Sequence, residues 1–152
     1  MRRTATILAA IALMLTFSSG VALAAYEQTI TGTGHTDILS GTSQSEQISG
    51  LGGSDQINGG GGSDLVRGDS GPDELSDGRG QDTVYGGGGD DNLIGYSDTS
   101  VDYFYAGGGD DTVQSRDVPA VKDVVDCGAG TDTVYADKAD VVSDDCERVR
   151  IR

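Results

Sequence analysis

The chain has 152 residues, enough for one domain, and a formal net charge of −15. So acidic a surface makes nucleic acid an unfavourable partner, because binding phosphates needs basic side chains, and cations are the natural partners instead. The 25 Gly and only 2 Pro exclude collagen and Pro-rich disorder, while 5% aromatic residues and no Trp provide little material for a conventional core.

The first 24 residues have the layout of a secretory signal peptide. Arg2 and Arg3 precede an apolar run from Ala5 to Phe17, and a small-x-small cleavage site follows at 22–24. The run is too short to span a bilayer, although an uncleaved anchor is the alternative. The segment holds two basic residues and no acid, so its removal leaves a net charge of −17. We therefore expect a secreted, extracellular protein without a membrane span.

A nine-residue pattern fills residues 32–135, after a short lead-in at 25–31. In the unit Gly59–Arg67, Gly occupies the first, second and fourth places, Asp the sixth and an apolar residue the eighth. The strongest copies run from Gly50 to Ile94, and the two before them are degenerate. The units at 95–105 and 115–126 are longer by two and three residues. A short, strict period of this kind indicates a solenoid.

The eighth place is apolar in every unit and is mostly β-branched, which suits short strands. We expect each unit to form a six-residue turn and a three-residue strand with one inward side chain. The Gly content and the missing 3.6-residue period exclude helix. The eighth-place residues are Leu39, Ile48, Ile57, Val66, Leu75, Val84, Leu93, Phe104, Val113, Val125 and Val134.

This pattern, Gly-Gly-x-Gly-x-Asp-x-apolar-x, resembles the RTX, or hemolysin-type, calcium-binding nonapeptide repeat of secreted bacterial proteins. The resemblance implies an all-β fold, a right-handed parallel β-roll in which two units make one coil. It also implies that calcium ions lie between turns stacked on the same edge of the roll. Residues 136–152 would then close the roll as a C-terminal cap.

In such a roll the acidic residues form two columns. One edge stacks Asp37, Asp55, Asp73, Asp91, Asp111 and Asp132, and the other stacks Glu46, Asp64, Asp82 and Asp102. Coils about 4.8 Å apart place neighbouring carboxylates where they repel by about 3.5 kcal/mol at an effective dielectric of 20. A hard dication with oxygen ligands, such as calcium, relieves this repulsion. We therefore expect the chain to bind several Ca²⁺ ions and to fold on binding them, the calcium-free chain being disordered.

The candidate metal-binding residues combine the sixth-place Asp with the Gly of the turns. Gly permits φ > 0, which aims backbone carbonyls inward, and Asp90 and Asp110 add a second acid at two turns. Binding at Glu46 or Asp102 is doubtful, because the surrounding Gly are missing. The set is Asp37, Gly50, Gly52, Gly53, Asp55, Gly59, Gly60, Gly62, Asp64, Gly68, Gly71, Asp73, Gly78, Gly80, Asp82, Gly86, Gly87, Gly89, Asp90, Asp91, Gly107, Gly109, Asp110, Asp111, Gly128, Gly130 and Asp132.

Cys127 and Cys146 are predicted to form a disulfide that ties the tail to the last coil, in keeping with an exported chain. No Cys-x-x-Cys spacing or histidine cluster favours a zinc site or a catalytic thiol. His35 is the one histidine and stands in a degenerate turn, where we expect it to be exposed. No catalytic triad can be assembled around it, so we do not expect an enzyme.

Outward places on one predicted sheet carry Tyr85, Tyr103 and Tyr105. They predict either a partner face, for a glycan, the cell wall or a second copy, or a cross-strand aromatic ladder that only stabilises the sheet. The sequence as a whole indicates a secreted calcium-binding protein with a structural or adhesive role at the cell surface or matrix. The alternative is a calcium-dependent accessory module of an extracellular enzyme or toxin.

Overall fold

Fourteen strands alternate between two parallel sheets in the part of the chain that the computed structural model describes, residue 26 and residues 28–152. The predicted signal peptide lies outside these residues. None of the described residues forms a helix with the length and hydropathy of a membrane span. Sheet A contains β1 (Gln28–Thr31), β3 (Glu46–Ser49), β5 (Leu65–Ser70), β7 (Thr83–Gly88), β9 (Tyr103–Gly108), β11 (Val124–Ala129) and β13 (Val141–Val142). Sheet B contains β2 (Ile38–Ser40), β4 (Gln56–Asn58), β6 (Glu74–Ser76), β8 (Asn92–Ile94), β10 (Thr112–Gln114), β12 (Thr133–Ala136) and β14 (Arg148–Ile151).

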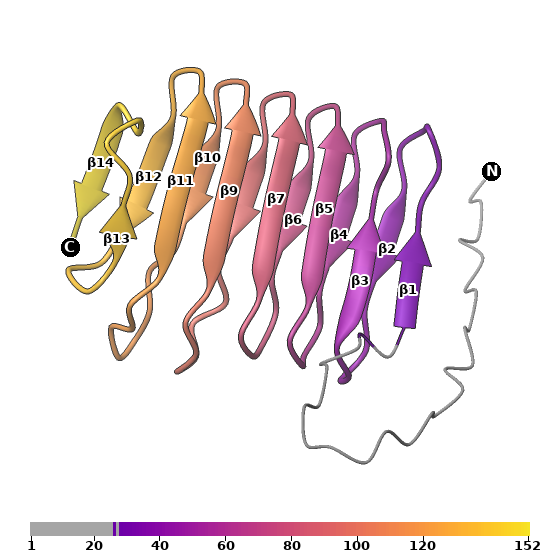
Figure 1. Ribbon diagram of the computed structural model, residues 1–152, viewed down its shortest axis with the longest axis horizontal. Coiled ribbons are helices and arrows are strands. Elements are labelled where there is room, and N and C mark those ends of the chain that lie inside the picture. Colours follow the sequence, from indigo (N-terminus) through magenta and orange to yellow (C-terminus); the bar gives the residue numbers. More distant parts are fainter. Residues whose placement is uncertain (1–25, 27) are drawn as a thin grey trace, which may run out of the picture.

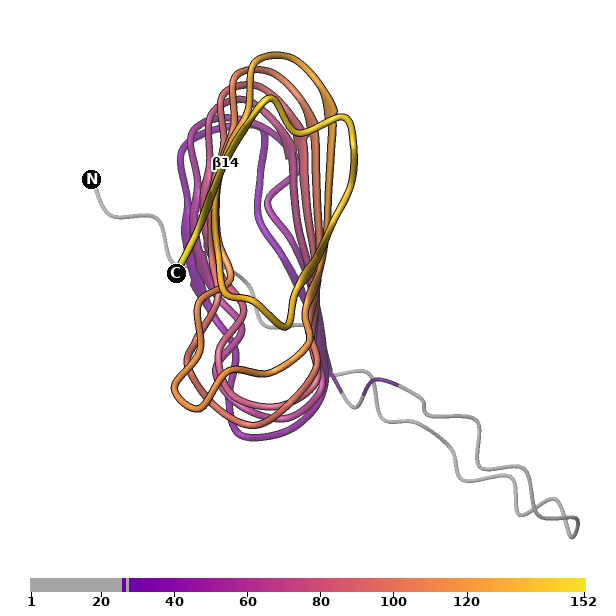
Figure 2. The ribbon, with the colours of Figure 1, turned by 90° about the vertical axis from the view of Figure 1, so that its left-hand side faces the viewer.

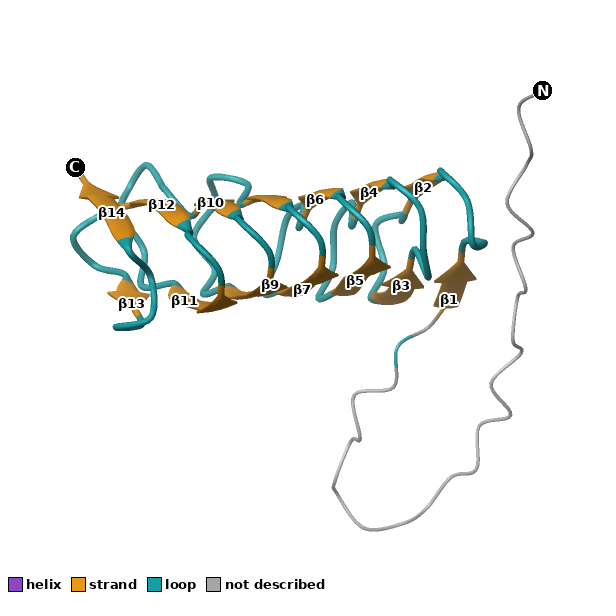
Figure 3. Ribbon diagram, turned by 90° about the horizontal axis from the view of Figure 1, so that it is seen from above, coloured by secondary structure: helices purple, strands orange, loops and turns teal. Residues whose placement is uncertain are grey.

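The alternation of odd and even strands confirms the predicted parallel β-roll. Each strand pairs with the strand two positions further along the chain, so the odd-numbered strands form one sheet and the even-numbered strands form a second sheet behind it (Figure 1). Viewed along the long axis the coils superimpose as closed loops (Figure 2), and from above the sheets form two facing layers joined by turns (Figure 3). Two nine-residue units therefore make one coil, and alternate turns stack on opposite edges.

The core is a single row of eighth-place side chains that lies between the two sheets. Eleven such residues were predicted, and each is at most 2% exposed. Ile30 of β1 joins the same cluster, so the segment expected as a lead-in contributes the first strand of the roll. Sheet A adds a second inward position two residues after the eighth place, which Ala106 and Cys127 occupy.

The predicted three-residue strand is correct for β2, β4, β6, β8 and β10 of sheet B but wrong for most of sheet A. Strands β5, β7, β9 and β11 have six residues each. Their extra residues belong to the next turn, whose backbone also pairs between coils, as in Asp69 with Gly87 and Gly87 with Gly107. The turn on this side therefore continues the ladder of the sheet.

The C-terminal end of the roll is closed by the predicted disulfide between Cys127 and Cys146. Cys127 is an inward residue of β11, and Cys146 lies between the last two strands, β13 and β14. These strands pair in parallel with β11 and β12. The tail thus completes the last coil, and the covalent bond fixes it to the core.

Candidate metal centres in the turns

The first predicted column of carboxylates lies along one edge of the roll as a continuous hydrogen-bonded ladder. The backbone N–H of each sixth-place acid donates to a carboxylate oxygen of the sixth-place acid one coil later. The donor–acceptor distances are 2.8 Å for Asp37–Asp55, 2.7 Å for Asp55–Asp73, 2.8 Å for Asp73–Asp91, 2.7 Å for Asp91–Asp111 and 2.8 Å for both Asp111–Asp132 and Asp132–Glu147.

The second edge carries an equivalent ladder. Its distances are 2.8 Å for Glu46–Asp64, 2.7 Å for Asp64–Asp82 and Asp82–Asp102, 2.9 Å for Asp102–Asp123 and 3.1 Å for Asp123–Asp140. Asp102 is 2% exposed and keeps its place despite the missing Gly around it. Asp123, Asp140 and Glu147 extend the two ladders beyond the predicted columns. Each stands two residues before an apolar residue, a spacing that identifies them even where the Gly pattern is lost.

At seven ladder carboxylates the second oxygen is buried and has no hydrogen-bond partner. Buried polar groups in proteins are normally paired, so a row of unpaired carboxylate oxygens marks places that suit a cation. These atoms are the Oδ2 atoms of Asp55, Asp64, Asp73, Asp82, Asp91, Asp111 and Asp132.

Glycine at the first place of a unit leaves open space beside these oxygens. A Cβ at Gly68 would collide with Asp73 Oδ2 and would lie 2.7 Å from the carbonyl oxygen of Gly86 in the next coil. A Cβ at Gly50 would collide with Asp55 Oδ2 in the same way. Carboxylate and carbonyl oxygens from consecutive coils thus converge on one small volume, and this is the donor chemistry that calcium prefers.

Glycine at the second and fourth places is needed for another reason, because the backbone there adopts a left-handed conformation. Gly60 and Gly62 have φ of 101° and 117°, and the glycines at these two places in later units keep positive φ, from 87° at Gly128 to 154° at Gly130. First-place Gly such as Gly68 is not among the residues with positive φ. The prediction that all three glycines supply positive φ is therefore wrong for the first place, where the reason is space.

Burial within the stacked turns raises the pKa of the ladder carboxylates. For Asp82 burial is the main cause, the N–H of Asp64 opposes it, and the neighbouring Asp64 carboxylate adds to it. The raised pKa values are about 6 for Asp64 and Asp111, about 7 for Asp82, Asp91 and Asp102, and about 8 for Asp123. A carboxyl with a pKa of about 7 is half protonated at neutral pH when no cation is bound, so a proton and a metal ion compete for the same oxygens.

The two degenerate turns at the N-terminal end are built differently. The Thr33 N–H and hydroxyl donate to Asp37 Oδ2 at 2.6 and 2.8 Å, and Thr42 makes the same pair of contacts with the Glu46 carboxylate. A threonine therefore satisfies the oxygen that is left unpaired in the central coils. His35 in the first of these turns is exposed, as predicted.

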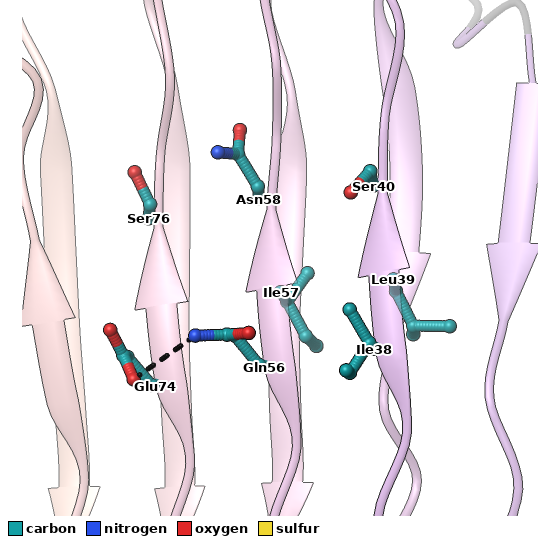
Figure 4. Close-up of a pocket in the computed structure, with 8 residues that line it drawn as sticks. All are labelled: Ile38, Leu39, Ser40, Gln56, Ile57, Asn58, Glu74 and Ser76. Carbon is teal, nitrogen blue, oxygen red and sulfur yellow. Dashed lines mark hydrogen bonds between the residues drawn. The ribbon is translucent and has the colours of Figure 1, made fainter. Parts of the chain in front are cut away.

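The outer faces of the sheets carry no comparable concentration of charge. A shallow hollow on sheet B is lined by eight described residues, of which Glu74 is the one titratable side chain, and it accepts a hydrogen bond from Gln56 at 3.3 Å (Figure 4). On sheet A the rings of Tyr85 and Tyr105 stack at 4.8 Å, with the Arg67 guanidinium 5.4 Å from the Tyr85 ring centre. Chemistry suited to a metal is therefore concentrated at the two edges.

Comparison with known protein families gives the same assignment. The family model of the RTX calcium-binding nonapeptide repeat matches four times, at residues 31–66, 40–75, 67–101 and 96–115. The chain belongs to this family. Searches of the curated proteins and of the solved structures returned no match. The RTX matches end at residue 115, whereas both carboxylate ladders continue past it, so the roll extends the repeat to the C-terminal cap.

The RTX family binds calcium, and the turns of this chain fit that ion. The buried Oδ2 atoms supply charge, and carbonyl oxygens that converge beside the first-place Gly supply neutral ligands. Calcium accepts six to eight such oxygens in flexible geometry, which suits turns that differ in detail. The chain is thus a calcium-binding repeat protein with several ion sites.

Replacing Gly68 by Ala tests the role of space at the first place. The new Cβ would crowd Asp73 Oδ2 and the Gly86 carbonyl, so we expect calcium affinity at this turn to fall toward that of the turn in which Ala106 holds the same place. Gly88→Ala is the matched control, because a Cβ there meets no atom within 4 Å. Calorimetric calcium titration measures both variants, and equal behaviour of the two would refute the assignment.

The raised pKa values predict that acid partly replaces calcium. A carboxyl with a folded-state pKa above its unfolded value near 3.9 stabilises the fold most at low pH, and this stability is lost as pH rises through about 6 to 8. In chelator, the strand signal in circular dichroism should therefore increase from pH 8 to pH 5. In calcium, affinity should fall from pH 8 to pH 5, because protons compete with the ion for the same carboxylate oxygens. A metal-free signal that does not respond to pH would contradict this.

Proposed function

We propose that this chain is a secreted, non-enzymatic protein that folds around calcium outside the cell and serves as a structural or adhesive module of the surface or matrix. One observation carries the proposal, namely the two ladders of buried carboxylates whose second oxygens have no partner. A fold that buries so many like charges is unfavourable without a cation, so calcium binding and folding are coupled.

The setting outside the cell follows from the affinity that such sites have. Extracellular calcium modules bind with Kd values of about 10⁻⁴–10⁻³ M, which keeps them empty where calcium is scarce and filled where it is abundant. The apolar, arginine-led segment at residues 1–24 supports export. The disulfide between Cys127 and Cys146 suits an oxidising compartment.

The structural role is supported by what the turns and faces contain. His35 is exposed, and the acids of the ladders are spaced for cation binding, each bonded to the next coil. A catalytic pair of carboxylates needs two groups with different environments and room for a substrate between them. Ladder acids such as Asp73 and Asp91 instead share one repeated environment, with raised pKa values from the same cause.

The adhesive part of the proposal rests on sheet A. Tyr85 is 37% exposed and stacks on half-buried Tyr105, and Tyr103 lies two residues away on the same outward face. Arg67 extends this row by its contact with Tyr85. A flat row of aromatic and guanidinium groups suits the apolar face of a sugar or a second copy of the sheet.

A calcium titration of the secreted chain tests the function itself. We expect the strand signal to appear with calcium and to disappear with chelator, and calorimetry to report several ions per chain. Asp73→Asn should weaken binding at least about tenfold, because it removes charge from an unpaired oxygen, whereas Asp37→Asn should change little, because Thr33 already satisfies that carboxylate. Full folding in chelator, or uptake of no more than a single ion, would exclude the proposal.

Replacing Tyr103 and Tyr105 by Ser separates adhesion from stability. If the face binds a partner, attachment of the calcium-loaded chain to cells or isolated cell-wall glycans should be lost while its calcium stoichiometry is kept. Ser49 and Gln47, on the outward face of β3, provide a matched pair for control substitution by Ala. Unchanged attachment with a lower melting temperature would show that the tyrosines only stabilise the sheet.

A further inference from the structure

Asp77 is an acidic residue at a place where the neighbouring units on its edge have glycine. It holds the first place of its unit, as Gly59 does one coil earlier. At Gly59 a Cβ would lie 2.9 Å from Asp64 Oδ2, within the volume assigned to the ion. A side chain at this place on the Asp77 edge therefore lies beside the cation site of its own turn. Asp77 is 0% exposed, so its carboxylate lies inside the roll.

One oxygen of Asp77 is fully satisfied and the other is not. Asp77 Oδ1 accepts the backbone N–H of Gly78 at 2.5 Å and of Tyr96 at 2.7 Å. Asp77 Oδ2 is buried without a partner. The two N–H donors hold the carboxylate in one orientation, so the unpaired oxygen is directed at a fixed point.

That point is shared with two ladder carboxylates. Oxygen atoms of Asp77, Asp82 and Asp102 lie within 4.8 Å of one another, and all three residues are buried. Asp82 Oδ2 is a second unpaired oxygen in the same group. The basic residue of the unit, Arg79, is directed elsewhere: its guanidinium lies 5.2 Å from the Tyr96 ring centre and donates to the Tyr96 hydroxyl at 3.0 Å.

We propose that Asp77, Asp82 and Asp102 form a buried three-carboxylate site for a hard cation, with one more carboxylate than the regular turns in which glycine holds the first place. The inference rests on the proposed calcium binding and adds to it a ligand outside the repeat pattern. The negative charge of two carboxylates neutralises a divalent ion, whereas that of three carboxylates neutralises a trivalent ion. This site therefore binds calcium more tightly than the regular glycine turns and prefers a trivalent lanthanide over calcium more strongly than they do.

Terbium alone, added to the folded chain in excess calcium, is the probe. Tyr96 donates to Asp77 and Tyr103 follows Asp102, so tyrosine excitation should sensitise terbium at this site, in a chain that has no Trp. The wild type should take up terbium at this site first. Asp77→Asn keeps the shape and removes the charge, and it should weaken this uptake at least about tenfold. Asp126→Asn, an exposed acid on β11, is the charge-matched control and should not change it.

The outcomes separate this site from the proposed function. A wild-type chain that takes up no calcium would refute both the proposed function and the three-carboxylate site. Calcium-dependent folding together with equal terbium uptake by wild type and Asp77→Asn would overturn only the three-carboxylate site, because it would mean that Asp77 stays protonated beside Asp82. If Asp77→Asn does not fold in calcium, Asp77→Gly restores the usual glycine and should fold. Loss of the terbium preference in Asp77→Gly supports the site, and its retention overturns it.

Discussion

The hydrogen bond from the backbone of one ladder acid to the carboxylate of the next determines the rest of the roll. Because one oxygen of Asp73 accepts the N–H of Asp55, the carboxylate cannot turn outward to water, and its other oxygen is left buried. The same bond repeats every 18 residues in the regular coils and spans 20 or 21 residues at the longer units. The extra residues are therefore accommodated in loops outside the ladder, and the edge keeps its register.

Each glycine of the repeat answers a separate physical demand. The second and fourth places need a left-handed backbone, which is strained for other residues, yet Leu51 and Asp69 adopt φ of 73° and 72° at the second place. At the first place glycine leaves volume next to a carboxylate and a carbonyl oxygen, as at Gly68, whereas Ala106 and Cys127 hold this place in two later units. A substitution at the second place therefore strains the chain, whereas a substitution at the first place changes the donor set of the ion site.

The sequence predicted the fold well because each unit repeats both its apolar residue and its acid at fixed places. The columns containing Asp55 and Asp64, the single-file core and the disulfide all follow from that period. What it did not predict depends on context that a nine-residue pattern does not contain. Strand β1 is not preceded by a glycine-rich turn that would reveal it, and the six-residue strands arise from backbone pairing between stacked turns. The burial of Asp77 cannot be predicted from the other units, because the equivalent residue there is Gly and has no side chain.

The two ends of the roll show why the central coils need an ion and the terminal ones need other bonds. In a solenoid each coil is stabilised by its neighbours, and a terminal coil has a neighbour on one side only. A terminal turn has no further turn beyond it with which it could share an ion. At the N-terminal end Thr33 and Thr42 supply hydrogen bonds in place of a cation, and at the C-terminal end Glu147 continues the ladder beside the Cys127–Cys146 disulfide. The loss of the glycine pattern at the N-terminal end is thus part of how the roll is closed, since a turn whose carboxylate is already satisfied by hydrogen bonds does not need the open volume that glycine provides.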